Sequence, residues 1–330
     1  MKKKMWAPLA LLLMLVVSAC GNNANNNNAG ASPSASESAS PSASAPASPS
    51  AGASASANAS GKMTYESENG PVEVPAAPKR IIALSSAPNV ISLGGTLVGV
   101  DQWTAGNRLF KDKLQGVEVV SAEDLEKIIE LNPDLIIVGS TEKNIDKLKE
   151  IAPTVVYTWG KLDYLKQQIE IGKLLNKEQE AQAWADDFSK RAAAIGDEIK
   201  AKAGADVTVT VFELYDKQFY VFGNNWARGT EIVYQAMGLG MPEKVKKDAL
   251  GPGYYTLSTE VLPEYAGDYI ILSRSATGDN GALNTDTWKN MPAVKAGHVI
   301  EIDTEASSYS DPITLEYLMN IFKEGILGKA

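Results

Sequence analysis

The 330-residue chain is poor in cysteine and histidine, two residue types on which many enzymes and metalloproteins depend. Cys20 is the only cysteine, which excludes an internal disulfide and a multi-thiolate metal site. His298 is the only histidine, which argues against histidine-based acid–base catalysis and against histidine-rich zinc or manganese sites. The sequence also has no Gly-x-Ser-x-Gly, Walker or His-Glu-x-x-His motif, and no Gly-x-Gly-x-x-Gly run after a strand. We therefore expect a protein that is not an enzyme and needs no cofactor.

Positive charge is in the minority as well. The chain has 31 lysines and arginines against 40 acids, a net charge of −9 at pH 7. This balance gives no support for a nucleic-acid partner, because such partners require basic surfaces.

The longest apolar run, residues 9–17, is too short for a membrane-spanning helix. Three lysines precede it, and Val17-Ser18-Ala19-Cys20 ends it, so residues 1–20 have the organisation of a signal peptide. The small residues before Cys20 resemble the lipobox of secreted lipoproteins, in which the cysteine is diacylated and becomes the new N-terminus. We expect an extracytoplasmic protein anchored to the cell membrane through Cys20. The alternative is a non-lipidated secretory signal with an incidental cysteine.

Residues 21–61 consist almost entirely of Ala, Ser, Pro, Asn and Gly. A segment of this composition cannot bury enough apolar surface to offset the entropy of ordering, so it predicts a disordered tether.

Residues 62–176 predict a first α/β lobe. Short apolar runs that are typical of buried parallel strands alternate here with helical segments. The runs lie at 81–84, 97–100, 133–138 and 154–157. Ligands of such sheets bind beyond the carboxyl ends of the strands, and five residues are expected at that edge. They are Ser85, Trp103, Arg108, Thr141 and Trp159.

A long helix is expected at residues 177–203, capped by Asn176 in a capping box with Gln179 and ended by Gly204. Its apolar residues recur every three or four positions and form one narrow stripe. They are Trp184, Phe188, Ala192, Ile195 and Ile199. The helix is either an ordinary amphipathic surface helix or a strut about 40 Å long that joins two lobes.

Three linked stretches of the first lobe resemble the ferric-siderophore branch of the ABC-importer substrate-binding proteins. They are Pro78-Lys79-Arg80-Ile81-Ile82, the segment 124–136 with its Leu131-Asn132-Pro133-Asp134, and Ile151-Ala152-Pro153-Thr154-Val155. The resemblance covers roughly Pro71 to the C-terminus. It implies the class III fold, two three-layer α/β lobes joined by one long helix. Residues 177–203 are then the strut, and residues 204–330 form the second lobe.

The second lobe places Trp226 and Arg228 in a loop between a strand, residues 219–223, and a helix. An indole offers a flat apolar face, and a guanidinium offers a fixed fork of donors for oxyanions. The segment resembles the hydroxamate-siderophore members of the family, in which this Trp and Arg contact the ligand. The alternative is that Arg228 pairs with an acid and Trp226 belongs to the core. With the edge residues above, we predict ligand contacts from Trp226, Arg228, Tyr220, Tyr309, Trp159, Arg108, Trp103 and Arg274.

One position departs from the family pattern. Close relatives that bind linear hydroxamates have a tryptophan next to the aromatic residue before Asp311-Pro312, whereas this chain has Ser308 beside Tyr309. The missing indole removes apolar contact area, which leaves the identity of the siderophore open. Arg274 could add charge for a citrate-containing ligand, and a solvated arginine is the alternative.

The resemblance also implies a transport partner. In the family, one acid per lobe docks onto arginines of the membrane permease, and the matching residues here are Glu126 and Glu260. The alternative is that both are ordinary solvated acids. We expect a monomer that binds an iron(III)-siderophore of the hydroxamate type, with the metal held by the siderophore alone. It would deliver this ligand to an ABC permease and its ATPase. Two alternatives stay open: another bulky chelate (ferric citrate, a catecholate, haem or cobalamin), and a surface enzyme that processes siderophores.

Overall fold

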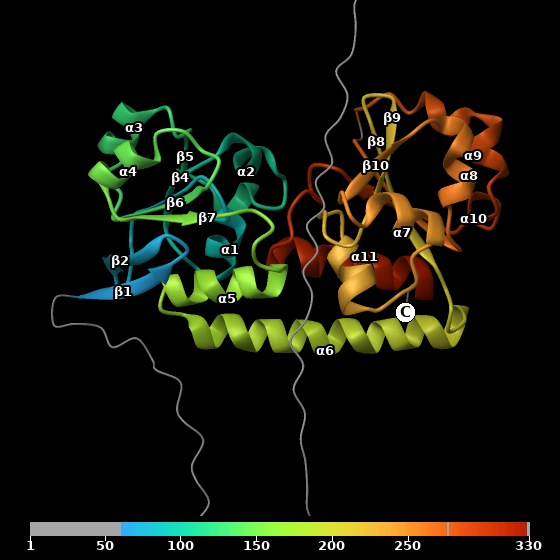
Figure 1. Ribbon diagram of the computed structural model, residues 1–330, viewed down its shortest axis with the longest axis horizontal. Helices are drawn as coiled ribbons and strands as arrows, with labels where there is room; N and C mark the ends of the chain where they lie inside the picture. The colour runs from blue at the N-terminus through green and yellow to red at the C-terminus, as the bar shows by residue number, and fades with distance from the viewer. Residues whose placement is uncertain (1–60, 276, 329–330) are drawn as a thin grey trace, which may run out of the picture. The chain divides into compact units, whose positions relative to one another are not determined.

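The computed structural model describes residues 61–275 and 277–328 (Figure 1). The predicted signal peptide with Cys20, and all but the last residue of the predicted tether, therefore lie outside the described residues. Within the described ranges, no helix is both long enough and apolar enough to cross a membrane.

The first lobe is built on a five-stranded sheet in which all strands are parallel, in the order β5-β4-β3-β6-β7. Its middle strand β3 is short and completely buried, and successive side chains of β3 point into two different cores. Ile81 faces the core under α1, α5 and the β1–β2 hairpin, and Ile82 faces the core under α3 and α4. The elements are β1 (Lys62–Ser67), β2 (Gly70–Pro75), β3 (Ile81–Ala83), α1 (Ala87–Ser92), β4 (Leu97–Val100), α2 (Gln102–Gly106), η1 (Lys111–Lys113), β5 (Glu118–Val119), α3 (Leu125–Glu130), β6 (Leu135–Gly139), α4 (Ile145–Ile151), β7 (Thr154–Tyr157) and α5 (Tyr164–Leu174).

The second lobe is built on a mixed five-stranded sheet in the order β10-β9-β8-β11-β12. β8, β11 and β12 are parallel, and β9 turns back against β8 through Asp216 and Lys217, both with positive φ. Two positive φ angles in a two-residue turn match the twist of a hairpin. The elements are β8 (Val209–Tyr215), β9 (Gln218–Phe222), the π-helix η2 (Glu231–Ala236), α7 (Glu243–Ala249), β10 (Tyr254–Leu257), η3 (Thr259–Val261), α8 (Leu262–Tyr265), β11 (Tyr269–Arg274), η4 (Gly281–Asn284), α9 (Asp286–Asn290), α10 (Pro292–Lys295), β12 (Val299–Asp303) and α11 (Pro312–Leu327).

Helix α6 (Glu178–Ala203) runs along both lobes (Figure 1). It packs against α5 of the first lobe and against α11 and η2 of the second. The predicted stripe is the face that it buries, with Phe188, Ala192 and Ile199 fully enclosed. Both sheets carry helices on both faces, so the predicted fold class, two α/β lobes joined by one long helix, is confirmed.

The predicted N-cap of this helix is wrong. Asn176 has a φ of 56° and donates its backbone N–H to Lys173, so it ends α5 in the left-handed conformation that often follows a helix. The cap position of α6 is taken by Lys177, and no side chain caps the helix there. The connection between α5 and α6 is short. Asn176, which the capping pattern assigned to the start of α6, instead forms the turn after α5. At the other end, Gly204 stops α6 with a φ of 109°, as predicted.

Candidate functional site

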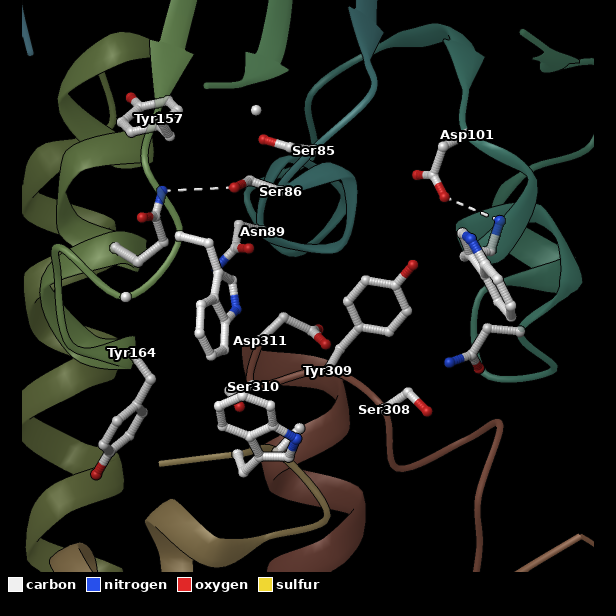
Figure 2. A pocket seen from close by; sticks show the side chains of 18 of the residues that line it. Ser85, Ser86, Asn89, Asp101, Tyr157, Tyr164, Ser308, Tyr309, Ser310 and Asp311 are labelled. Carbon is white, nitrogen blue, oxygen red and sulfur yellow. Dashed lines mark hydrogen bonds between the residues drawn. The ribbon is translucent and has the colours of Figure 1, made fainter. Parts of the chain in front are cut away.

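A large cleft opens where the two lobes face each other, with a volume of about 1150 Å³. The first lobe contributes the segments that follow β3, β4, β6 and β7, and the second contributes the end of β8 and two loops, 225–228 and 304–311. Figure 2 shows Ser85, Asp101 and Tyr157 from the first lobe facing the same space as Tyr309 and Asp311 from the second. The cleft therefore lies at the carboxyl ends of the strands, the place where the sequence predicts the site.

Aromatic side chains from both lobes line this cleft. The exposed fractions of Trp103 and Trp159 are 83% and 74%, unusually high for indoles. Trp159 meets Trp226 of the other lobe edge to face, with ring centroids 4.9 Å apart. Tyr309 is held by an edge contact with Phe110 at 5.6 Å and by a 3.1 Å hydrogen bond with the Thr104 hydroxyl. The cleft therefore offers several flat apolar faces to a large ligand.

The backbone around Trp226 fixes its ring. The indole lies 5.2 Å from the ring of Tyr254 and directly over Gly253, where a Cβ atom would come within 2.4 Å of the indole carbons. Gly253 also has a φ of +91°, a conformation that side chains rarely allow. This glycine is thus a positioning residue for Trp226.

Arg228 lines the cleft and is also paired with an acid. Its Nε and Nη2 donate to the Glu213 carboxylate at 2.8 and 3.1 Å. Ser273 donates a further hydrogen bond of 2.8 Å to the same carboxylate, and the Arg228 backbone N–H donates to the Ser307 carbonyl at 2.8 Å. The structure therefore shows the alternative in which Arg228 pairs with an acid, Glu213. The guanidinium also remains at the cleft wall, so the pairing does not remove it from the site.

Two further carboxyl groups at the cleft are buried. Glu231 accepts hydrogen bonds from the Ala227 backbone N–H at 3.0 Å and from the Thr230 hydroxyl at 3.1 Å, and burial raises its pKa. Asp311 begins α11 by accepting the backbone N–H of Ile313 at 2.9 Å, and burial raises its pKa to about 6. Burial without a basic partner favours the neutral form of a carboxyl group, which explains both directions.

Three of the predicted contact residues do not line the cleft. Arg108 pairs with Asp303 at 3.6 Å and donates to the Tyr317 hydroxyl at 2.7 Å, so it joins the two lobes instead. Tyr220 packs on the second-lobe core with its ring 6.1 Å from Tyr254. Arg274, the last residue of β11, donates to Glu301 of the edge strand β12 at 3.0 Å. The predicted contacts from Arg108, Tyr220 and Arg274 are corrected accordingly, because the sequence does not fix the direction in which each side chain points.

The sequence reading missed several residues of the cleft. Tyr157, Tyr164, Glu213, Glu231, Glu305 and Asp311 all line it. A signal was present for Glu213, since a carboxylate inside the buried strand β8 needs a charged or hydrogen-bonding partner. Ser308, the residue beside Tyr309, also lines the cleft and donates its hydroxyl to the Thr304 carbonyl at 2.6 Å.

The two predicted docking acids lie on the surface, one per lobe. Glu126 is in the first turn of α3, and Glu260 is in η3, directly before α8. Both side chains are exposed. Among all the residues that the structure describes, no three His, Cys, Asp or Glu side chains lie close enough together to hold a metal ion.

The chain is similar to a group of known proteins over most of its length. A family model for "Periplasmic binding protein" matches residues 82–306. The iron(3+)-hydroxamate-binding protein FhuD of Bacillus subtilis (strain 168) is 35% identical over 325 residues, which cover 96% of this chain and 95% of that protein.

Solved structures give the same picture. The FhuD protein from S. pseudintermedius superposes with a TM-score of 0.74 at 34% identity, covering 81% of this chain and 99% of that one. FhuD2 from Staphylococcus aureus with bound ferrioxamine B superposes with a TM-score of 0.72 at 38% identity, covering 76% of this chain and 98% of that one. Since the family model spans more than half of the sequence and the relatives align almost from end to end, the chain belongs to the periplasmic binding protein family.

Proposed function

We propose that this protein is an extracytoplasmic receptor that captures an iron(III)-siderophore of the hydroxamate type in its interlobe cleft. The cleft itself carries the proposal, because about 1150 Å³ lined by Trp103, Trp159, Trp226 and Tyr309 suits a bulky chelate better than a small polar solute. A siderophore brings its own oxygen ligands to iron, so the protein needs only to hold the finished complex.

The names of the relatives support the choice of ligand class. FhuD of Bacillus subtilis is an iron(3+)-hydroxamate-binding protein, and FhuD2 of Staphylococcus aureus was solved with ferrioxamine B. Within the cleft we assign ligand contacts to Trp103, Trp159, Trp226, Arg228 and Tyr309. The lobe division of residues 62–176 and 204–330 around the helix at 177–203 belongs to the same proposal.

We propose that binding involves no chemistry on the ligand. The only histidine, His298, lies outside the cleft, stacked on Tyr269 with ring centroids 4.3 Å apart. The hydroxyl groups that do line the cleft therefore have no histidine beside them to act as a general base. The family is one of binding proteins, which agrees with this assignment.

Tryptophan fluorescence tests the ligand class directly, because three of the six tryptophans line the cleft. The purified protein is titrated with linear and citrate-based ferric hydroxamates, a ferric catecholate, ferric citrate, haem and cobalamin. We expect saturable quenching by a ferric hydroxamate, since bound chelate lies against the indoles. A Trp226→Ala variant, which removes one of the indoles proposed to contact the ligand, should lose part of the quenching and of the affinity.

The outcomes separate the alternatives. Tight binding only to a catecholate, ferric citrate, haem or cobalamin would keep the receptor role and reject the hydroxamate. Hydrolysis or reduction of a bound ferric siderophore, detected by mass or by release of iron, would instead establish the surface enzyme.

Delivery to an ABC permease and its ATPase is the second part of the proposal, with Glu126 and Glu260 as docking acids on a monomeric receptor. Rim charges of this kind orient a complex more than they add affinity. A Glu126→Ala, Glu260→Ala double variant is therefore expected to bind ligand normally and to stop uptake of iron-loaded siderophore by whole cells. Exposed acids elsewhere, such as Glu198→Ala on α6, provide the control. Impaired ligand binding in the double variant would refute the docking assignment.

The lipid anchor completes the transport proposal. Diacylation of Cys20 would hold the receptor at the membrane without a transmembrane helix. In the same uptake assay, Cys20→Ala should release the protein into the medium and lower uptake while leaving ligand binding unchanged. Retention of the variant in the membrane fraction would contradict the anchor.

A further inference from the structure

The ionisable side chains that line the cleft are strongly unbalanced. Five acids line it, Asp101, Glu213, Glu231, Glu305 and Asp311, against one base, Arg228. Burial raises the pKa of Glu231 and of Asp311, so the negative charge of the cleft comes mainly from the other acids. Glu213 engages two nitrogens of that arginine, so the arginine supplies no unpaired positive charge to a ligand.

The bases next to the lining residues are neutralised too. Lys161 Nζ lies 3.3 Å from Glu68, and Arg108 Nε lies 3.6 Å from Asp303. Neither basic side chain therefore offsets the acids inside the cleft.

Asp101 and Glu305 provide negative charge without a basic partner. Among the described residues, no lysine or arginine forms an ion pair with either, and the Glu305 carboxylate accepts no hydrogen bond. Both belong to one corner of the cleft, which we call the acidic corner. The Thr104 hydroxyl joins Asp101, at 2.5 Å, to Tyr309, at 3.1 Å, and the Asn107 amide donates to the Glu305 carbonyl at 2.8 Å.

Asp311 is an independent sign that the cleft receives a hydrogen-bond donor. Its side chain is 1% exposed and lines the cleft, and its Oδ2 has no hydrogen-bond partner in the part of the chain that the structure describes. A buried acceptor without a partner costs stability, which a donor from a ligand or the neighbouring Thr314 hydroxyl, also without a partner among the described residues, could restore. Carboxyl groups thus line the cleft both at the acidic corner and at the start of α11, where Figure 2 labels Asp101 and Asp311.

We propose that the cleft selects among ferric hydroxamates by charge, in the order ammonium-bearing, then neutral, then carboxylate-bearing. The selection rests on the proposed function, since it concerns ligands of the same site. Three hydroxamate anions neutralise iron(III), so the peripheral groups of the ligand set its net charge. Low-dielectric walls lined by one sign of charge concentrate ligands of the opposite sign. Ferric citrate and ferric tris-catecholates, which are anionic, are disfavoured by the same field.

The test compares three ligands that differ only at one end: ferrioxamine B with its free amine, its N-acetyl derivative and its N-succinyl derivative. Fluorescence titration at low ionic strength is expected to show affinity falling by roughly three- to fivefold at each step, and the differences should shrink in salt. Equal affinity for all three, or tighter binding of the succinyl derivative, would overturn the charge selection and leave the hydroxamate receptor standing. Absence of binding by all three would overturn both.

A charge reversal at the acidic corner isolates the residue responsible. Glu305→Lys is expected to reduce or invert the preference for the amine over the succinyl derivative, and Glu305→Gln to reduce it by about half as much on a logarithmic scale. The side chain is exposed, so neither change disturbs packing. Glu198→Lys, an exposed acid on α6 outside the cleft, is the matched control and should leave the order of affinities unchanged. An undiminished preference for the amine over the succinyl derivative in Glu305→Lys would remove the acidic corner from the proposal.

Discussion

Replacing Arg228 with alanine is expected to lower the free energy of unfolding by about 3–5 kcal/mol, because it leaves a buried carboxylate without its counter-charge. The exposed fractions of the Arg228 and Glu213 side chains are 18% and 7%, so water compensates little for the lost pair. Urea denaturation measures the change. Arg274→Ala is the matched control, since Arg274 pairs with Glu301, whose side chain is 51% exposed, and its loss should cost less than about 1 kcal/mol.

A second variant separates the two roles of Arg228. Removing both charges, in Glu213→Gln with Arg228→Met, should recover much of the lost stability, because no unpaired charge remains buried. If Arg228 also contacts the siderophore, this stable variant should still bind it more weakly, by roughly 1–3 kcal/mol. Full affinity in the double variant would show that Arg228 is purely structural. A stable Arg228→Ala single variant would show that the Glu213 carboxylate is solvated or protonated in the fold.

The parts of the fold that the sequence predicted are those in which one periodicity dominates. The buried runs of β6 and β7 and the apolar stripe of α6 are continuous patterns, and the structure has strands and a helix there. β5 was not predicted because it has two residues, both exposed. β10 was not predicted because three of its four residues are exposed. Such edge strands are defined by pairing with a neighbouring strand, and this pairing cannot be predicted from the local hydrophobic pattern.

The candidate site was predicted less completely for a related reason. Trp226 and Arg228 stood out because their chemistry is unusual at a strand–helix junction, and both line the cleft. Glu213 and Asp311 belong to it through tertiary packing, which brings the end of β8 and the start of α11 beside that loop. The direction of a loop side chain is also set by tertiary packing, as Arg108 illustrates by donating to the Tyr317 hydroxyl of α11.

Gly196 provides the second large expected effect, in the middle of α6. Replacing a glycine inside a helix with alanine ordinarily stabilises the helix by about 1 kcal/mol. Here a Cβ atom would come within 2.1 Å of the Met237 carbonyl oxygen, at the end of the π-helix η2, and within 2.8 Å of two more backbone atoms of Met237. Backbone atoms cannot swing aside as a side-chain tip does, so overpacking outweighs helix propensity. We expect Gly196→Ala to destabilise the protein by about 3 kcal/mol in urea denaturation.

The control for helix propensity is Ala194→Gly, at an exposed position two residues earlier in α6, which should cost about 1 kcal/mol. The two substitutions are chemically opposite, so destabilisation by both shows that contact with η2 decides the sign at Gly196. The displacement should also reach the cleft, because η2 begins at Glu231, which binds the Ala227 backbone N–H beside Trp226 and Arg228. Weaker ferric hydroxamate binding by Gly196→Ala under conditions where it is fully folded would establish that route. A Gly196→Ala variant as stable as the parent would mean that α6 and η2 separate at little cost, and that the lobes are joined less rigidly than their packing on α6 implies.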